Sequence, residues 1–193
     1  MANVQHSAIT DPNIHEPKGV SSAAAGKVYV ANGSGSGSWE LPAGSAYGDM
    51  YIDAGATAQT LAAASATAKL NPTGEWTANG SKNVTISGSN GTITVSQAGE
   101  YQLNFWIVFE TAAISSGAAY NFYYAVNGTP FTRKVYVKKP TNSTDTLHVY
   151  ATGYASLVAN DVISIYVGGD GTSSGTNITP KEAGLSCLLV DPA

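Results

Sequence analysis

The stretch of residues 99–110 constrains the fold more strongly than any other part of the chain. Its large apolar side chains recur at every second position, namely Tyr101, Leu103, Phe105, Ile107 and Phe109. In a β-strand successive side chains point to opposite faces, so a period of two places all of these on one face. We expect that face to lie in a hydrophobic core, and the stretch therefore predicts a long central strand.

The opposite face of this strand is polar at its start and apolar in its middle. Gln102 and Asn104 are followed on that face by Trp106 and Val108. A strand with one solvated face normally keeps polar residues there, so Trp106 and Val108 indicate that part of the second face is also covered. We expect a second layer or another copy of the chain to cover it, and we predict Trp106 and Val108 to be subunit-interface residues.

Shorter runs of alternating residues predict further strands. Residues 84–87 and 92–96 flank a turn in which Asn90-Gly91 is a strong hairpin signal. Residues 54–70 suit a helix by their alanines and a strand by their threonines, and we favour extended structure. Many short strands joined by Gly, Asn and Pro turns predict an all-β fold, an antiparallel sandwich or barrel. The other predicted strands are residues 47–53, 118–126, 131–138, 146–157, 161–167 and 184–190.

Composition argues against several classes of function. Charged residues make up 11 % of the chain and the net charge is −4, with no basic cluster longer than the pairs Arg133-Lys134 and Lys138-Lys139. Nucleic-acid binding normally needs a basic stripe, so we expect no nucleic-acid partner. No apolar run approaches the roughly 18 residues of a membrane span, and the first residues lack the pattern of a secretion signal. We therefore expect no membrane partner and synthesis in a cytoplasm.

Cys187 is the only cysteine of the chain. A single cysteine forms no disulfide within the chain and no cysteine-based metal site. Leu185 and Leu189, two positions away on either side, share its strand face. We therefore predict a buried, unreactive thiol.

Residues 1–48 differ in pattern from residues 49–193, and we predict a domain boundary between them. The first part has prolines at positions 12 and 17, little periodicity, and a Gly/Ser-rich linker at residues 32–38. Its apolar residues are too far apart to form a core, so we expect an extended N-terminal arm that becomes ordered on a partner. The predicted anchoring residues are Ile9, Asp11, Ile14, His15, Glu16, Lys18 and Val20.

The chain offers little that indicates catalysis or metal binding. The irregular spacing in the arm favours polar docking contacts over a metal site, and the carboxylate pairs of the main domain lack the spacing of an EF-hand loop. We predict no catalytic residues, no metal, no cofactor and hence no enzyme. Aromatic residues 120 and 122–124 could form a sugar-binding platform, although packing in the core or between subunits suits them better. The residues of metal-ligand type are His6, Asp11, His15 and Glu16 in the arm, and Asp49/Asp53 and Asp161/Asp170 beyond it.

Four segments of the main domain form a familiar pattern. They are Gly-Glu-Tyr-Gln-Leu-Asn-Phe at residues 99–105, Ala-Val-Asn-Gly at 125–128, the strand after Asp161, and the last strand at 185–190. Together they resemble the C1q/TNF-like jelly roll over about residues 47–193. The resemblance implies an antiparallel jelly-roll sandwich that forms a homotrimer. Asn160 stands where that family usually has glycine, and a collagen-like stalk is missing, so a complement-type role is not implied.

The arm carries a second resemblance. His-Glu-Pro-Lys-Gly at residues 15–19, followed by residues 26–33 and 37–39, resembles the start of phage head-fibre and capsid-decoration proteins. This implies a trimeric bacteriophage protein, made in the bacterial host cytoplasm and placed on the capsid surface of the virion. Its arm would bind the major capsid protein or another virion protein, while the jelly roll projects outward.

Two alternatives remain open at this point. The same chain could be a tail-fibre or receptor-binding protein whose jelly roll recognises a host surface glycan. A glycan-hydrolysing tailspike is the weaker alternative, because no carboxylate pair stands out.

Overall fold

The computed structural model describes residues 23–31, 34, 37–40, 42, 45–59, 61, 67–111, 118–139, 146–169 and 177–193. By its internal contacts the chain divides into two compact units, Met1–Pro42 and Ala43–Ala193. The second unit begins upstream of residue 49, because Ala46 is buried and the strand that starts at Tyr47 belongs to its sheet. Among the described residues there is no α-helix, and so no helix that could cross a membrane.

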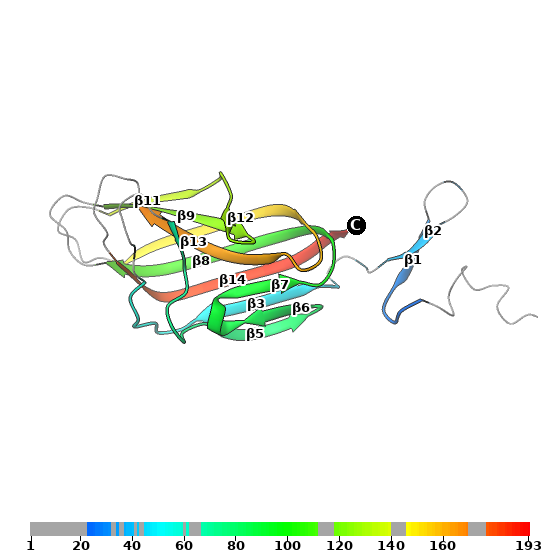
Figure 1. The fold of residues 1–193 in the computed structure, drawn as a ribbon, viewed down its shortest axis with the longest axis horizontal. Coiled ribbons are helices and arrows are strands. Elements are labelled where there is room, and N and C mark those ends of the chain that lie inside the picture. Colours follow the sequence, from blue (N-terminus) through cyan, green and yellow to red (C-terminus); the bar gives the residue numbers. More distant parts are fainter. Residues whose placement is uncertain are drawn as a thin grey trace, which may run out of the picture. The chain divides into compact units, whose positions relative to one another are not determined.

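One sheet of the larger unit has five strands, and every neighbouring pair is antiparallel (Figure 1). The stretch that dominates the sequence forms β8 (Gly99–Thr111), which pairs with a long strand on each side. It is thus an interior strand, as its alternation predicts. In spatial order the strands are β12 (Leu147–Leu157), β8, β14 (Ile178–Pro192), β3 (Tyr47–Ile52) and β5 (Thr77–Lys82).

The other sheet of this unit has seven strands. Its last two strands confirm the predicted hairpin: they pair directly and are joined by a 3₁₀ turn, Gly88–Asn90, that ends at Gly91 with a φ of 61°. The main path runs through β10 (Thr129–Pro130), β9 (Ala118–Val126), β13 (Val162–Gly169), β7 (Thr92–Val95) and β6 (Val84–Ser87), with β11 (Val135–Lys139) paired to β9 and β4 (Thr67–Lys69) paired to β13.

The order of the strands is that of a jelly roll. Along the chain the long strands alternate between the two sheets: β7 and β9 lie in one, β8 in the other, and β12, β13 and β14 alternate again. As a result β14 lies beside β8 in one sheet, and β13 lies beside β9 in the other. The protein is therefore an all-β antiparallel jelly-roll sandwich, which confirms the predicted fold class.

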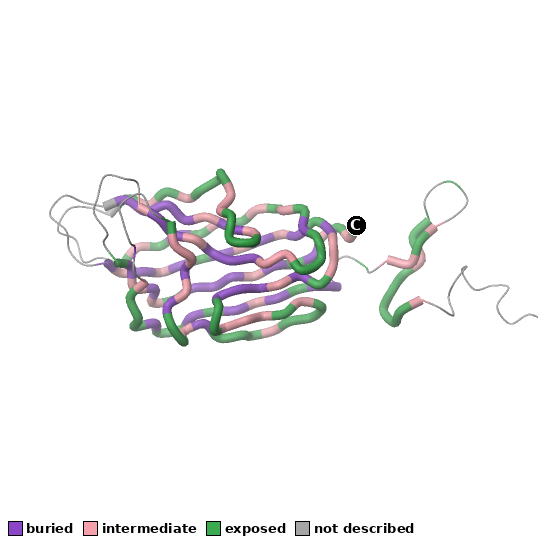
Figure 2. Tube along the Cα trace, in the orientation of Figure 1, coloured by how far each residue is buried: buried purple, intermediate pink, exposed green. Residues whose placement is uncertain are grey.

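The core lies between the two sheets, and the buried residues recur along the strands of both (Figure 2). Aromatic rings from the two sheets meet in it. Phe109 of β8 meets Tyr120 and Phe122 of β9 at centroid distances of 5.5 and 5.2 Å, and Phe105 meets Tyr124 at 4.7 Å. Tilted and edge-on contacts of this kind suit the charge distribution of aromatic rings. Tyr120, Phe122 and Tyr124 are buried and thus pack in the core, the preferred interpretation of that aromatic segment.

The described part of the first unit is a small β-hairpin. β1 (Val28–Ala31) pairs with β2 (Gly37–Glu40), and the Tyr29 and Trp39 rings meet edge to face at 5.4 Å. The predicted linker at residues 32–38 is therefore wrong at its end, since Gly37 and Ser38 belong to β2. A side chain at position 37 would collide with the carbonyl oxygen of Val30. Gly37, which was predicted to be part of a flexible linker, therefore allows β1 and β2 to approach each other closely. All predicted anchoring residues between Ile9 and Val20 lie outside the described residues.

Two turns at one end of the sandwich are joined by side-chain hydrogen bonds. Asn127, in the turn after β9, donates from Nδ2 to Asp161 Oδ1 at 2.7 Å, and its Oδ1 accepts the Val162 N–H at 2.9 Å. Asp161 Oδ2 also accepts the Val158 N–H at 2.9 Å. Asn127 has a φ of 52°, which asparagine tolerates better than most residues. The pair therefore holds the β9–β10 turn against the β12–β13 turn.

Replacing Asp161 with alanine should lower the free energy of unfolding by about 1–3 kcal/mol, because it removes two hydrogen bonds to a charged group. Urea denaturation followed by tryptophan fluorescence measures the change. Asp53→Ala is the matched control, an exposed carboxylate with no hydrogen bond among the described residues, and should shift the free energy by no more than about 0.5 kcal/mol. Equal effects of the two substitutions would contradict the role given to Asp161.

Cys187 lies in the core with 2 % of its surface exposed, and burial raises the pKa of its thiol to about 12, with a backbone hydrogen bond at Gly48 acting the other way. The reactive form of a thiol is the thiolate, so native protein at pH 8 should react with a disulfide reagent on the order of a thousandfold more slowly than unfolded protein. Absorbance of the released thiolate follows both reactions. Comparable rates with and without denaturant would show that the thiol is accessible.

Candidate functional site

The outer face of the five-stranded sheet carries a row of aromatic side chains. Trp106 of β8 pairs in register with Tyr150 of β12 on one side and with Gly184 of β14 on the other. Gly184 in turn pairs with Tyr51 of β3. Tyr150, Trp106 and Tyr51 are 63 %, 40 % and 36 % exposed, and we call these three residues the aromatic row. The predicted interface residue Trp106 is thus at its centre.

Gly184 determines how the tryptophan of this row lies. A Cβ atom at position 184 would collide with Nε1 of the Trp106 indole, with Cε2 and Cδ1 also close. The indole therefore occupies the space above the Gly184 backbone, where any other residue would place its side chain. The ring thus lies over β14, the strand between β8 and β3.

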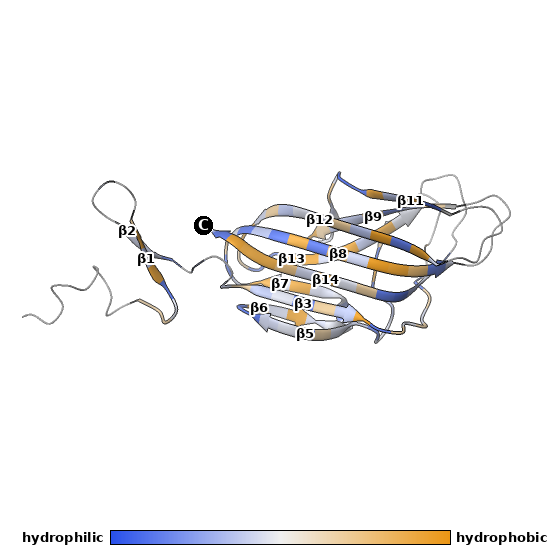
Figure 3. Cartoon of the chain, turned by 180° about the vertical axis from the view of Figure 1, so that it is seen from behind, coloured by the Kyte–Doolittle hydropathy of each residue, from blue (hydrophilic) through white to orange (hydrophobic). Residues whose placement is uncertain are grey.

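A polar row and a row of mixed polarity, called the mixed row, run parallel to the aromatic row. Figure 3 views the molecule from this side, with β12, β8, β14, β3 and β5 next to one another. Asp49 in the polar row accepts a hydrogen bond from Asn79 Nδ2 at 2.8 Å. The face therefore offers aromatic surface beside hydrogen-bonding groups. By register, the polar row is Thr152, Asn104, Ser186 and Asp49, and the mixed row is Tyr154, Gln102, Leu188 and Tyr47.

A shallow cavity of about 260 Å³ lies beside Trp106 on the same face. Its walls include Trp106, Val108, His148 and Tyr150. Val108 is half-buried and His148 is exposed, so the cavity is open to solvent. The structure thus brings both predicted interface residues together at one hollow and adds two residues from β12.

The groups with shifted pKa values lie in the core and in a loop. Burial raises the pKa of Tyr101 to about 12 and also raises that of Tyr124. Burial would raise the pKa of Glu75 as well, but its Oε1 accepts the N–H groups of Ala56 and Thr57, and the net effect is a lowered pKa. Glu75 therefore acts as an ionised support for the loop after β3.

The structure assembles no metal centre from the part of the chain that it describes. Asp49 is hydrogen-bonded to Asn79, and Asp161 joins the two turns described above. Asp53 is exposed at the end of β3. The remaining residues of metal-ligand type, which fall outside the described ranges, are Asp170 and the arm residues His6, Asp11, His15 and Glu16.

Sequence reasoning found the centre of this face and missed its surroundings. Trp106 and Val108 stand out because they interrupt a polar pattern within one strand. Tyr150 and Tyr51 belong to alternating segments too, but only the register between strands places them beside Trp106. The sequence indicates only that each of these tyrosines lies at an outward position of its own strand.

Comparison with known proteins gives similarity at the level of solved structures. No protein-family model and no curated protein matches the chain. The Eiger TNF of S. frugiperda is 8 % identical with a TM-score of 0.48, over 77 % of this chain and 95 % of that one. The globular domain of zebrafish complement 1qA is 11 % identical with a TM-score of 0.48, over 77 % and 99 %. Murine APRIL is 11 % identical with a TM-score of 0.45, over 75 % and 99 %. The jelly-roll assignment itself rests on the strand order described above.

Proposed function

We propose that the protein is a structural virion protein of a bacteriophage, a homotrimeric head fibre or capsid decoration protein. In this proposal residues 1–42 attach the protein to the capsid, by contact with the major capsid protein or another virion protein. The jelly roll projects from the capsid surface, and the chain is made in the bacterial host cytoplasm. The aromatic row is the observation that carries self-assembly, and the arm's resemblance to head-fibre proteins supports the virion role.

Self-assembly follows from the exposure of the aromatic row. A soluble monomer seldom leaves a contiguous group of large apolar side chains in water, and such patches usually mark an interface. Tryptophan and tyrosine are also the residues that contribute most to binding when they lie at the centre of an interface. Identical subunits most often cover such a patch in a closed ring, and the number three comes from the sequence resemblance.

The hairpin β1–β2 supports attachment through the first unit. Val28 and Val30 are exposed on it. A two-stranded hairpin is marginal by itself in water, so it gains stability by burying these side chains on another surface. In a trimer three arms bind together, and modest affinity per arm then adds up to firm attachment.

Recognition of a host glycan is the second candidate, in which the protein is a tail-fibre or receptor-binding protein. The polar row beside the aromatic row favours it, because sugars are bound by rings that contact their apolar faces and by groups that hydrogen-bond their hydroxyls. Asn104, Ser186 and Thr152 would supply those bonds. The number of copies per particle distinguishes decoration of the capsid from a tail tip.

Trp106→Glu should dissociate the trimer, because it places a charge in the middle of the buried interface. Size exclusion with light scattering gives the mass of the full chain, and we expect a trimer for the wild type and a folded monomer for the variant. Tyr136→Glu is the matched control, a 53 % exposed tyrosine on β11 of the other sheet, and should stay trimeric. A monomeric wild-type protein at micromolar concentration contradicts the proposal. A Trp106→Glu trimer that no longer adsorbs to host cells favours glycan recognition.

Removal of residues 2–42 should leave a folded jelly roll that no longer co-sediments with capsids. The full chain with both Val28 and Val30 replaced by lysine should bind capsids at least tenfold more weakly if the hairpin docks there. Val158→Lys, at an exposed valine of the jelly roll, is the control and should bind normally. Full occupancy of capsids by the truncated protein would place the docking surface on the jelly roll instead.

A further inference from the structure

The open side of the sandwich contains a groove that borders the outer face described above, since Tyr150 and Thr152 line part of it. There β12 forms the edge of the five-stranded sheet, and residues 131–134, between β10 and β11, lie across from it. Two adjoining cavities of about 300 and 340 Å³ share Tyr124 and Arg133 as walls. The combined space is within the range of small-molecule sites in proteins.

Small side chains on the inner face of β12 create this space. The inward positions in the middle of the strand are Ala151, Gly153 and Ala155, opposite the rings of β9. A Cβ atom at position 153 would meet nothing closer than Tyr124 Cε2, at 3.8 Å. A Cβ atom would therefore fit there without collision, and Gly153, which has none, lines the first cavity.

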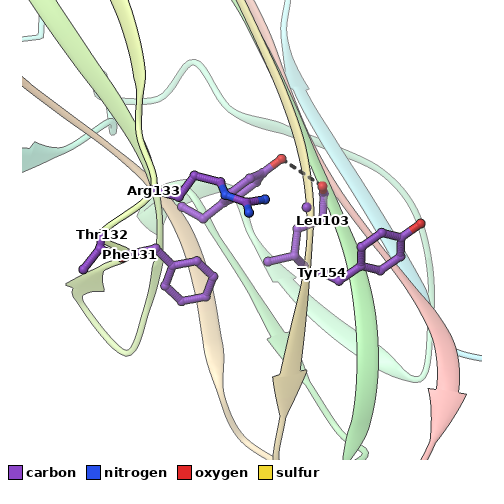
Figure 4. A pocket seen from close by; sticks show the side chains of 7 residues that line it. Leu103, Phe131, Thr132, Arg133 and Tyr154 are labelled. Carbon is purple, nitrogen blue, oxygen red and sulfur yellow. Dashed lines mark hydrogen bonds between the residues drawn. The ribbon is translucent and has the colours of Figure 1, made fainter.

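The walls of the first cavity are mainly apolar and aromatic (Figure 4). Phe131 and Arg133 lie on one side of it and Leu103 on the other, while the ring of Tyr154 points away from them. Tyr124 also lines the cavity. Tyr124 is firmly held, because its hydroxyl lies 2.8 Å from the Leu103 carbonyl oxygen and 2.6 Å from that of Ala151 and donates its proton between them. Burial raises the pKa of Tyr124, so the hydroxyl stays protonated and the cavity meets the ring rather than a charge.

A positive charge stands beside these apolar walls. Arg133 lines both cavities, and Lys134 lines the second. Within the described part of the chain neither residue has an ion-pair or hydrogen-bond partner. The protein has only 9 lysines and arginines in 193 residues and a net charge of −4, so two adjacent cations at a hollow are a marked local feature. A guanidinium group pairs with a carboxylate through two parallel hydrogen bonds.

We propose that this groove binds a small aromatic carboxylate. Its ring lies against Leu103, Phe131 and Tyr124, and its carboxylate pairs with Arg133. The first cavity, of about 300 Å³, has room for an aromatic ring and a short carboxylate arm, and aromatic walls favour an aromatic over an aliphatic body. A sugar acid offers the same charge but needs hydrogen bonds for every hydroxyl, and Thr132 and Tyr154 supply only a few.

The test measures binding of 4-fluorophenylacetate to the full chain by ¹⁹F NMR line broadening and by calorimetry. A ligand of this size should bind with a Kd on the order of 0.1–1 mM. The uncharged 4-fluorobenzyl alcohol and the sugar acid galacturonate should each bind at least about tenfold more weakly. Failure of the aromatic acid to bind, or equal binding of galacturonate, overturns the proposal.

Two substitutions locate the site. Arg133→Gln should weaken binding of the acid at least tenfold and leave the alcohol unchanged, whereas Lys138→Gln, an exposed lysine of β11 outside both cavities, should change neither. Gly153→Val should fill the first cavity and weaken both ligands. If it fails to fold, as judged by thermal melting, Gly153→Ala replaces it, since its methyl group meets Tyr124 at ordinary contact distance. Unchanged acid binding in Arg133→Gln overturns the assignment. Tyr150 of the aromatic row lines the second cavity, but none of the substituted residues belongs to that row, so the oligomeric state is tested separately by Trp106→Glu.

Discussion

The contact between the inner face of β8 and the rings of β9 is the interaction on which the rest of the structure depends. Phe105 and Phe109 each meet rings from the opposite sheet, and they are fully buried. Since β8 pairs with both β12 and β14, the side of the sheet to which a β8 side chain points is also the side to which its partners in β12 and β14 point. A slip of one residue in either pairing would turn that strand's core residues toward water, so the burial of this face fixes the register of the sheet. The aromatic row on the outer face is a consequence of the same register.

The sequence predicted those parts of the fold that depend on local pattern. The strand at residues 99–110, the hairpin around Gly91 and the alternation of residues 118–126 all appear as β-structure, because each is encoded within a few neighbouring residues. The last strand is longer than its alternating segment indicated. It begins at Ile178 and contains Pro180, with irregular pairing to β8 just after the proline. Proline is uncommon inside a strand. The local pattern therefore predicted a strand that begins only at residue 184, after the proline, whereas the observed strand includes it.

The candidate sites depend on pairings that are distant in sequence, and this limits what pattern alone predicts. Trp106 was found because it is unusual within its own strand, but the neighbour that positions it is Gly184, which carries no side chain and gives no apolar signal. Likewise the groove arises because Ala151 and Gly153 are smaller than the space between the sheets. An alternating pattern classes alanine as a core residue and says nothing about whether it fills its place.

The edge strand β12 connects the two surfaces. Its outward side presents Tyr150 and Tyr154, its inward side borders the groove, and its outer edge pairs with no strand among the described residues. Proteins usually protect a long edge strand, because an open edge invites aggregation. Here the β10–β11 connection borders β12 at the two cavities, and the outward Tyr150 and Tyr154 remain exposed. A neighbouring copy that covered the aromatic row would also shield the edge of β12, so burial of the exposed rings and protection of the edge favour the same assembly.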